Sequence, residues 1–176
     1  MFKEKTVKSN YLFNGKVINL RIDEVETHSN RISTREIVEH NGGVGIVAVE
    51  DGNVFLVRQY RRPLDEIIYE IPAGKLEKGE EPLNCAYREL EEETGYKALD
   101  MKLMTSIYTS PGFCTEKLYI YFCDKMVKTK TNFDEDEYLE LIEVPILEAK
   151  KMILEGTIKD AKSIVGILML NDFIDK

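Results

Sequence analysis

The chain has 176 residues, of which 43% are hydrophobic and 32% are charged, and its formal net charge is -8. This length favours one ordinary globular domain with a sizeable core. An acidic chain repels nucleic-acid phosphates on average, so the charge balance argues against a nucleic-acid-binding protein. No apolar run approaches the roughly 20 residues of a membrane span, and the N-terminus lacks a signal-peptide pattern. We therefore expect a cytoplasmic protein without a membrane partner.

The first half of the chain predicts antiparallel strands. Residues 16–27 and 31–40 alternate between apolar and polar side chains and are joined by a short polar turn. Residues 44–50 and 53–60 flank Asp51-Gly52, a dipeptide typical of a tight hairpin.

The sequence predicts a helix over residues 82–94. Pro82 suits the first turn and Gly95 follows as a stop. An apolar face is expected from Leu83, Ala86, Tyr87 and Leu90.

Strand-like and helical runs alternate in the rest of the chain. Strands are predicted at 99–109, 117–124 and 138–144, and helices at 145–156 and 162–173. This order indicates an α/β (α+β) fold in which a mixed β-sheet is sandwiched between helices, with an antiparallel N-terminal strand extension.

Three cysteines occur, at positions 85, 114 and 123. Their odd number and the lack of CxxC spacing argue against a disulfide framework or a zinc site. We expect reduced thiols that are buried as bystanders.

The most informative pattern lies on the predicted helix. Spacings of three and four residues place Glu89, Glu92 and Glu93 within an arc of about 100°. Like charges at such spacing cost only about 0.2–0.5 kcal/mol per pair, so a solvated acidic face is the alternative explanation. Clustered Glu oxygens also suit hard divalent cations such as Mg²⁺, which would cancel the repulsion and polarise a phosphoryl oxygen.

The segment before this helix adds a glycine-rich loop. Gly74 and Gly79 permit a tight turn with backbone carbonyls facing the carboxylates. Arg88 is placed to orient a carboxylate by bidentate hydrogen bonding, and Glu80 precedes the helix. The alternatives are a surface cation at Arg88 and a helix-dipole role for Glu80.

These residues match a known motif at every fixed position. Gly74, Glu80 and the run "RELEEETGY" from Arg88 to Tyr96 resemble the Nudix box. The segments "TREIVEH", "VRQY", "YEIPAGKLEKGE", "SPGF" and "DEDEYLEL" resemble, in order, the ADP-ribose pyrophosphatase branch over roughly residues 15 to 155. Pro111 lies fifteen positions beyond Tyr96, where this branch usually carries a proline.

The resemblance implies a metal-dependent enzyme that hydrolyses the pyrophosphate bond of ADP-ribose to AMP and ribose 5-phosphate. It implies two or three Mg²⁺ ions, with Mn²⁺ as the alternative. The implied ligands are Glu89, Glu92, Glu93 and the backbone carbonyl of Ala73.

The resemblance also implies substrate contacts outside the box. Arg61 aligns with the phosphate-contacting arginine of the family, and Glu36 and Glu70 align with positions that touch the nucleotide or the metal-bound diphosphate. The alternatives are a solvated strand end for the arginine and solvent-facing carboxylates for the two glutamates. Tyr11 and Phe13 stack on adenine or pack at an interface, and we leave both unassigned.

A water molecule that attacks phosphorus needs a positioned proton acceptor. The late acidic loop "KTNFDEDEYLEL" offers one, and Glu137 aligns best with the loop glutamate that serves as base in this branch. Glu93 is the rival base, and Arg88 completes the predicted catalytic set. A purely solvated acidic loop is the alternative.

Two other functions fit parts of the pattern. The same box acts on GDP-mannose, other NDP-sugars and further nucleoside diphosphate derivatives, because its chemistry concerns the diphosphate alone. A Nudix-like module that senses ADP-ribose without cleaving it usually shows an eroded box or an attached DNA-binding domain, and this sequence shows neither.

We expect residues 1–42 to form the strand extension and residues 43–176 the Nudix domain. Related pyrophosphatases are commonly homodimers in which N-terminal strands complete the partner's pocket, so a homodimer is expected. An intramolecular three-stranded sheet explains the same strands.

Overall fold

The computed structural model describes residues 1–131 and 138–174. The chain forms two compact units. The N-terminal unit comprises Met1–Gly42 and Tyr108–Lys117, and the sheet–helix unit comprises Gly43–Ile107 and Leu118–Lys176. Tyr108–Lys117 therefore packs with the N-terminal strands, although it lies far from them in the sequence. The division into residues 1–42 and 43–176 stays a prediction.

The N-terminal unit is built on a three-stranded antiparallel sheet. Its strands are β1 (Lys5–Asn14), β2 (Ile18–Glu26) and β3 (Ile32–His40), in that spatial order. The β2–β3 hairpin was predicted, and Asn30 adopts a positive φ of 57° in its turn. Strand β1 was not among the predicted strands.

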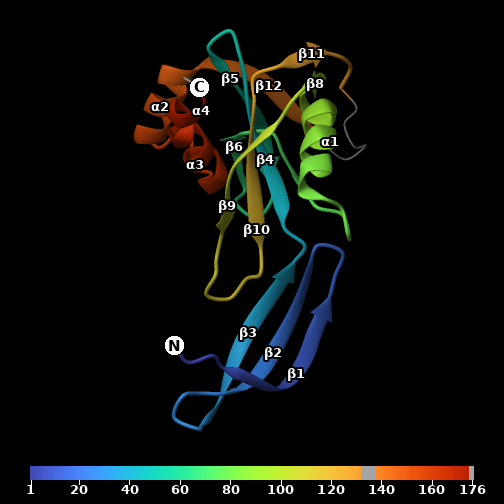
Figure 1. Cartoon of the computed structure of the whole chain (residues 1–176), viewed down its shortest axis with the longest axis vertical. Helices are drawn as coiled ribbons and strands as arrows, with labels where there is room; N and C mark the ends of the chain where they lie inside the picture. Colours follow the sequence, from blue (N-terminus) through green and yellow to red (C-terminus); the bar gives the residue numbers. More distant parts are fainter. Residues whose placement is uncertain (132–137, 175–176) are drawn as a thin grey trace. The chain divides into compact units, whose positions relative to one another are not determined.

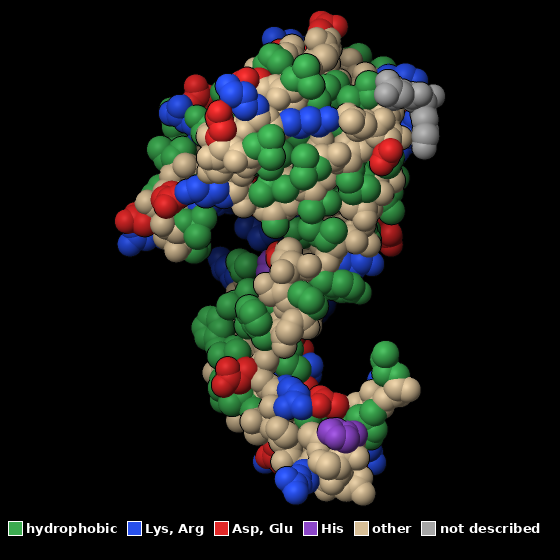
Figure 2. All heavy atoms as spheres, turned by 90° about the vertical axis from the view of Figure 1, so that its left-hand side faces the viewer, with side chains coloured by type: hydrophobic (Ala, Val, Ile, Leu, Met, Phe, Trp, Pro, Cys, Tyr) green, Lys and Arg blue, Asp and Glu red, His purple; other side chains and the backbone are tan. Residues whose placement is uncertain are grey.

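This sheet has almost no hydrophobic core of its own. In the N-terminal unit, all of whose residues are described, Val25 is the single buried hydrophobic side chain. Every residue of β1 is exposed. Hydrophobic side chains are visible on the surface of this unit in Figure 2. The exposed apolar residues of the three strands and their turns include Val7, Tyr11, Leu12, Phe13, Val17, Ile18 and Ile32.

The sheet–helix unit contains the strands of the hydrophobic core and all described helices (Figure 1). Its elements are β4 (Gly43–Glu50), β5 (Asn53–Arg61), β6 (Glu66–Glu70), β7 (Ala73–Lys75), α1 (Pro82–Thr94), β8 (Tyr96–Ala98), β9 (Lys102–Tyr108), β10 (Lys117–Cys123), β11 (Met126–Lys128), β12 (Leu139–Pro145), α2 (Ile146–Leu154), α3 (Ala161–Met169) and α4 (Asn171–Ile174). Within the described residues, no helix has the length and apolarity needed to cross a membrane.

Seven of these strands form one mixed sheet. The main order is β12-β5-β4-β10-β9, with β6 paired to β5 and β7 paired to β4. Strands β4 and β10 run parallel, whereas β4, β6 and β12 each pair antiparallel with β5. Strands β8 and β11 form a separate antiparallel pair.

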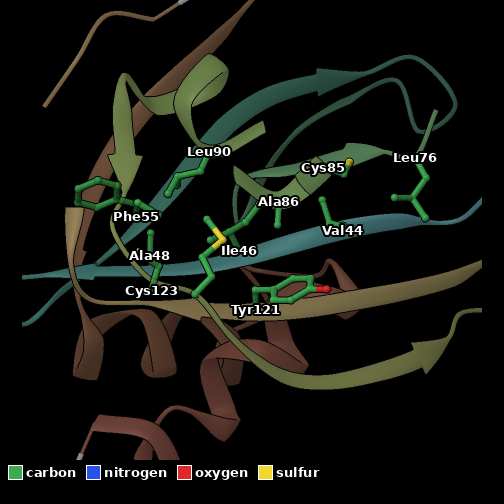
Figure 3. Close-up of a cluster of buried hydrophobic side chains, with 12 residues drawn as sticks. Val44, Ile46, Ala48, Phe55, Leu76, Cys85, Ala86, Leu90, Tyr121 and Cys123 are labelled. Atoms are coloured by element: carbon green, nitrogen blue, oxygen red, sulfur yellow. The ribbon is translucent and has the colours of Figure 1, made fainter. Parts of the chain in front are cut away.

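The sheet is covered on both faces, with α1 on one side and α2, α3 and α4 on the other (Figure 1). Because side chains alternate along a strand, β4 directs Val44, Ile46 and Ala48 into one core and Val47 and Val49 into the other. The first core includes Ala86 and Leu90 of α1 and is shown in Figure 3. The second is completed by α2, α3 and their connections, through Ala149, Ile158, Ile167 and Leu170. The predicted helix–sheet–helix architecture is confirmed.

Helix α1 has the predicted bounds, but its buried face differs in part from the prediction. Leu83 is 40% exposed, so its assignment to the apolar face was wrong. Cys85 is buried in the first core instead, because the helix turns the arc containing Cys85, Ala86 and Leu90 toward the sheet. Gly95 ends the helix at a φ of 70°, where its N–H donates to the carbonyl oxygen of Glu91.

The cysteines are free thiols throughout the described chain. Cys85 and Cys123 are buried, as predicted, whereas Cys114 is only half-buried. Burial raises the pKa of Cys85 to about 12 and that of Cys123 to about 11, so both thiols stay protonated at neutral pH.

Candidate active site

The site is built where the short strand β7 meets helix α1. Strand β7 pairs with the start of β4, so that Gly45 lies opposite Ala73 and Val44 opposite Gly74. A Cβ atom on Gly43 would lie 2.7 Å from the carbonyl oxygen of Gly74. The two backbones therefore approach as closely as they do because glycine occupies position 43.

Glu89 of α1 packs directly on this strand. A Cβ atom on Gly74 would lie 1.7 Å from Cδ of Glu89, so the absent side chain at position 74 leaves room for the carboxylate. The Glu89 side chain is 14% exposed. The first glycine of the motif thus admits a carboxylate rather than a turn with a positive φ.

Glu93 is held by the same strand from the buried side of α1. Its Oε2 accepts a hydrogen bond of 2.9 Å from the backbone N–H of Ala73, and the residue is only 3% exposed. The Ala73 N–H therefore fixes the Glu93 carboxyl group beside the residue whose carbonyl the family resemblance implies as a metal ligand. Glu93 belongs to the buried side of α1 rather than to its solvated edge.

Arg88 lies among three carboxylates. Its Nε and Nη2 donate to the two oxygens of Glu80 at 3.1 Å each. Its Nη1 donates to Glu89 at 2.8 Å and to Glu92 at 3.0 Å. Arg88 thus makes its bidentate contact with Glu80, and a shared single nitrogen orients Glu89 and Glu92.

These contacts shift the pKa values of Glu80 and Arg88. The hydrogen bonds from Arg88 lower the pKa of the Glu80 carboxyl group, and the same bonds raise the pKa of the guanidinium. Glu80 also accepts from the N–H of Glu77 at 2.9 Å, which closes the loop ahead of α1. Glu80 is therefore a partner of Arg88 as well as a residue placed before the helix N-terminus.

The donor chemistry of this cluster fits a hard divalent cation. Within residues 1–131 and 138–174, no three His, Cys, Asp or Glu side chains are arranged as a ready metal cage. Glu89 and Glu92 nevertheless converge on one cationic nitrogen of Arg88. Carboxylate oxygens are among the ligands that Mg²⁺ prefers.

The second predicted group, Arg61 and Glu70, forms an ion pair at the ends of β5 and β6. The guanidinium Nε donates to Oε1 at 3.1 Å and Nη2 donates to Oε2 at 2.5 Å. Glu70 is only 3% exposed, so the solvent-facing alternative is wrong for this carboxylate. By contrast, Arg58 and Arg62 form exposed pairs with Glu140 and Asp65.

The remaining predicted residues lie elsewhere. Glu36 is exposed on β3 of the N-terminal unit, opposite Ile22 in the strand register. Tyr11 donates its hydroxyl proton to Glu39 at 3.1 Å, and Phe13 is exposed on β1. Glu137 lies outside the described residues.

A polar cluster at the start of α3 was not predicted from the sequence. Lys162 is 8% exposed and its Nζ lies 3.5 Å from Oε2 of Glu70. Asp160 caps this helix by accepting from the N–H of Ser163 at 3.0 Å. An Asp directly before a helical run is a recognisable helix-start signal, but nothing local in the sequence indicates that the lysine is buried against β6.

The fold and this loop–helix site define a class of protein, and sequence comparison agrees with it. A family model described as "NUDIX domain" matches residues 39–164, and the chain belongs to the Nudix family. Nudix hydrolases generally use divalent metal ions, which agrees with the donor set on α1.

Several relatives match nearly the whole chain. It is 44% identical to the ADP-ribose pyrophosphatase of Bacillus subtilis, covering 96% of this chain and 92% of the relative. It is also 44% identical to the methanol dehydrogenase activator of Bacillus methanolicus, over 97% of this chain and 94% of the relative. A third relative, the ADP-ribose pyrophosphatase of Mycobacterium tuberculosis, is 36% identical over 95% of this chain and 83% of its own length.

A solved structure shares the fold. The crystal structure of an ADP compounds hydrolase superposes with a TM-score of 0.88, covering 99% of this chain and 96% of that chain. Its sequence identity is 18%, so the likeness concerns the architecture alone.

Replacing Arg88 by Met tests the electrostatic centre of the site. The variant keeps an apolar stem but leaves Glu80, Glu89 and Glu92 without their shared cation. We expect the free energy of unfolding to fall by about 2 kcal/mol, below the value for a fully buried pair because Arg88 is a third exposed. Urea denaturation at pH 7 without divalent ions measures the change.

Arg62→Met is the matched control, because it removes the same group from a pair that is 85% and 81% exposed. That variant should change stability by less than about 0.5 kcal/mol. Equal stability of the two variants would show that Arg88 does not hold the carboxylates together.

Proposed function

We propose that this protein is an ADP-ribose pyrophosphatase that hydrolyses ADP-ribose to AMP and ribose 5-phosphate with Mg²⁺. The observation that carries the proposal is the 44% identity, over 96% of the chain, to a relative bearing that name. The arrangement of Glu89, Glu92, Glu93 and Ala73 around one strand–helix junction supports it independently.

The proposed metal ligands are Glu89, Glu92, Glu93 and the Ala73 carbonyl oxygen. Two or three Mg²⁺ ions fit the family pattern, with Mn²⁺ as the alternative. When bound, such ions polarise the phosphoryl oxygens and lower the pKa of a coordinated water. The protein contributes the orientation of the carboxylates, which Gly74 admits and Arg88 and the Ala73 N–H hold.

An acidic protein must attract an anionic diphosphate through local cations. We assign the phosphate contact to Arg61, with Glu70 setting the orientation of its guanidinium through two hydrogen bonds. Glu36 is proposed as a further substrate contact by family resemblance. Arg88 acts in catalysis by orienting Glu89 and Glu92.

GDP-mannose and related NDP-sugars form a second candidate class of substrate. The GDP-mannose pyrophosphatase of Yersinia enterocolitica is 34% identical over 82% of this chain and 80% of its own length. The name of the Bacillus methanolicus relative describes an effect on another enzyme. Nothing in the diphosphate-centred box discriminates among groups flanking the diphosphate, so the substrate is decided by assay. A non-catalytic sensing module is the remaining alternative.

Hydrolysis of ADP-ribose in ¹⁸O-labelled water with Mg²⁺ tests the proposal. We expect AMP and ribose 5-phosphate as products, with the label on one of them identifying the phosphorus attacked. GDP-mannose, other NDP-sugars and dinucleotides that contain ADP are assayed beside it, and EDTA is the control. A higher kcat/KM for another substrate would overturn the assignment to ADP-ribose, and binding without cleavage of any substrate would indicate the sensing module.

Glu137 is proposed as the general base, and Glu93 is its rival. Glu137→Gln should lower kcat at least about 10²-fold, the lower range for loss of a general base, with the thermal midpoint unchanged. Glu135→Gln, a neighbour in the same acidic loop, is the matched control. If Glu137→Gln retains near-normal turnover, the role passes to Glu93 or to a loop neighbour.

Glu93 has a structural role that was not predicted from the sequence. Relief of like charge alone predicts no stability loss when Glu92 and Glu93 become glutamines. Glu93 is buried and accepts a backbone hydrogen bond, however, so Glu93→Gln is expected to affect folding as well as metal binding. Its turnover is therefore interpreted only after the thermal midpoint has been measured.

We also propose a homodimer formed through the N-terminal sheet. The support is that β1 is an edge strand, exposed along its whole length, in a unit with one buried hydrophobic side chain. Such an edge and such an apolar surface are normally covered. Light scattering at micromolar concentration should give twice the chain mass of 20.3 kDa, and a monomeric mass would refute the dimer.

The free cysteines support a cytoplasmic location, because a reducing compartment keeps such thiols unpaired. We therefore propose that the protein acts there on small-molecule nucleotides.

A further inference from the structure

Helix α3, which lies outside the Nudix box, carries a buried ammonium group. Lys162 is 8% exposed, and its Nζ lies 3.1 Å from Oδ1 of Asp160 and 3.5 Å from Oε2 of Glu70. A buried ammonium group is tolerated only when nearby carboxylates neutralise its charge. Lys162 thus depends on Glu70, and Glu70 is the same carboxylate that holds Arg61.

Gly166 lets this helix approach the sheet closely, and Gly45 of β4 lies beside the stem of Lys162. A Cβ atom on Gly45 would lie 3.5 Å from Cδ of Lys162 and 2.9 Å from Cδ1 of Ile71. A Cβ atom on Gly166 would lie 2.5 Å from Cγ2 of Val47. The stem of Lys162 therefore passes beside a strand residue that has no side chain, and its ammonium reaches the end of β6.

The same turn of α3 also holds the backbone after Glu70. The Ser163 hydroxyl accepts a hydrogen bond of 2.8 Å from the N–H of Ile71, and it donates to Oδ2 of Asp160 at 2.5 Å. Ser163 is fully buried. Asp160 therefore orients both Ser163 and Lys162, and each of these contacts the segment that begins at Glu70.

The segment from Glu70 to Ala73 is consequently held from both faces of the sheet. From one face, α3 binds the Glu70 carboxylate and the Ile71 N–H. From the other, Glu93 of α1 accepts from the Ala73 N–H. The proposed phosphate arginine and the proposed carbonyl ligand are attached to the two ends of this four-residue segment.

We propose that Lys162 is a positioning residue for substrate binding, acting through Glu70 on Arg61 and on the Glu70–Ala73 segment. This inference rests on the proposed hydrolysis of a nucleoside diphosphate derivative. Lys162 and Arg61 both pair with Glu70, so the buried carboxylate is neutralised by two cations rather than by the guanidinium alone. Without Lys162, the net charge near the proposed diphosphate site becomes more negative by one. Glu70 then attracts the Arg61 guanidinium more strongly.

The competing explanation is purely structural. Lys162 also neutralises Asp160, the N-cap of α3, and loss of that pair alone would weaken the docking of the helix. Asp160→Asn separates the two explanations, because asparagine is an equally good N-cap without the charge. It should rescue Lys162→Met if the lysine serves Asp160, and it should fail to do so if the lysine serves Glu70.

The experiment compares Lys162→Met with Lys159→Met in the full chain. Lys159 lies three residues earlier, is 64% exposed and forms a 3.5 Å surface pair with Glu66, so its replacement removes the same charge at an exposed position. A unit charge that acts over about 10 Å at an effective dielectric constant of about 20 changes a binding constant roughly tenfold. We expect Lys162→Met to raise the KM for ADP-ribose about tenfold and to change kcat less than threefold. Lys159→Met should leave both within twofold.

Hydrogen–deuterium exchange gives a readout that does not depend on activity. The amides of Ile71 and Ala73 should exchange faster in Lys162→Met than in Lys159→Met. If Lys162→Met fails to fold by circular dichroism, Lys162→Gln replaces it, because glutamine keeps part of the stem and a hydrogen-bond donor without the charge.

Four results would overturn the inference: a KM within twofold of wild type, a fall in kcat at unchanged KM, restoration of KM by Asp160→Asn, or equal exchange in the two lysine variants. A persistently raised KM in the Asp160→Asn/Lys162→Met double variant supports it. Failure of the wild-type protein to cleave any nucleoside diphosphate derivative refutes the proposed function instead, and the exchange measurement then decides the positioning role alone.

Discussion

Carboxylates crowd the polar side of α1, and the site depends on the cations and hydrogen-bond donors that stabilise their charge. A partly buried carboxylate is stable only beside a cation or a hydrogen-bond donor. Arg88 serves Glu80, Glu89 and Glu92, whereas Glu93 relies on the Ala73 N–H. These contacts require α1 to lie directly on β7.

The glycines follow from that requirement. Gly74 has no side chain because the Glu89 carboxylate occupies the space, and Gly43 lets the β4 backbone approach the Gly74 carbonyl. At both positions the reason for glycine is close approach rather than a left-handed backbone. The acidic residues of α1 and the glycines of the neighbouring strands are therefore parts of one packing arrangement.

Helix α1 and the β4–β5 hairpin could be predicted from local sequence signals. The bounds of α1 follow from Pro82 and Gly95, and the β4–β5 hairpin follows from Asp51-Gly52, which adopt φ values of 48° and 77°. Leu83 was misassigned because helical periodicity gives relative angles between side chains but does not say which arc the sheet covers.

Contacts between residues far apart in the sequence could not be predicted from such local signals. The pairing of Arg61 with Glu70 depends on the register of β5 against β6, in which Arg61 lies opposite Glu66 and Glu70 lies opposite Val57, so that only the long side chains bring the two groups together. The burial of Lys162 depends on α3 docking across the sheet from the Nudix box. A lysine in a helix normally indicates a solvated face, so its sequence context pointed away from its actual surroundings.

The two charge clusters differ in a way that suits a metal-dependent reaction on a diphosphate. Around Arg88, one cation faces three carboxylates, and this excess of negative charge favours dications. Around Glu70, two cations face two carboxylates, so the cluster is balanced and does not repel a phosphate as the first does. The Glu70–Ala73 segment joins the clusters through two hydrogen bonds on opposite faces of one sheet, from the N–H of Ile71 to Ser163 and from the N–H of Ala73 to Glu93. A fold in which both faces of a central sheet are covered by helices is what permits one short segment to be held from two sides, because the residues of the box alone would leave its other side without support.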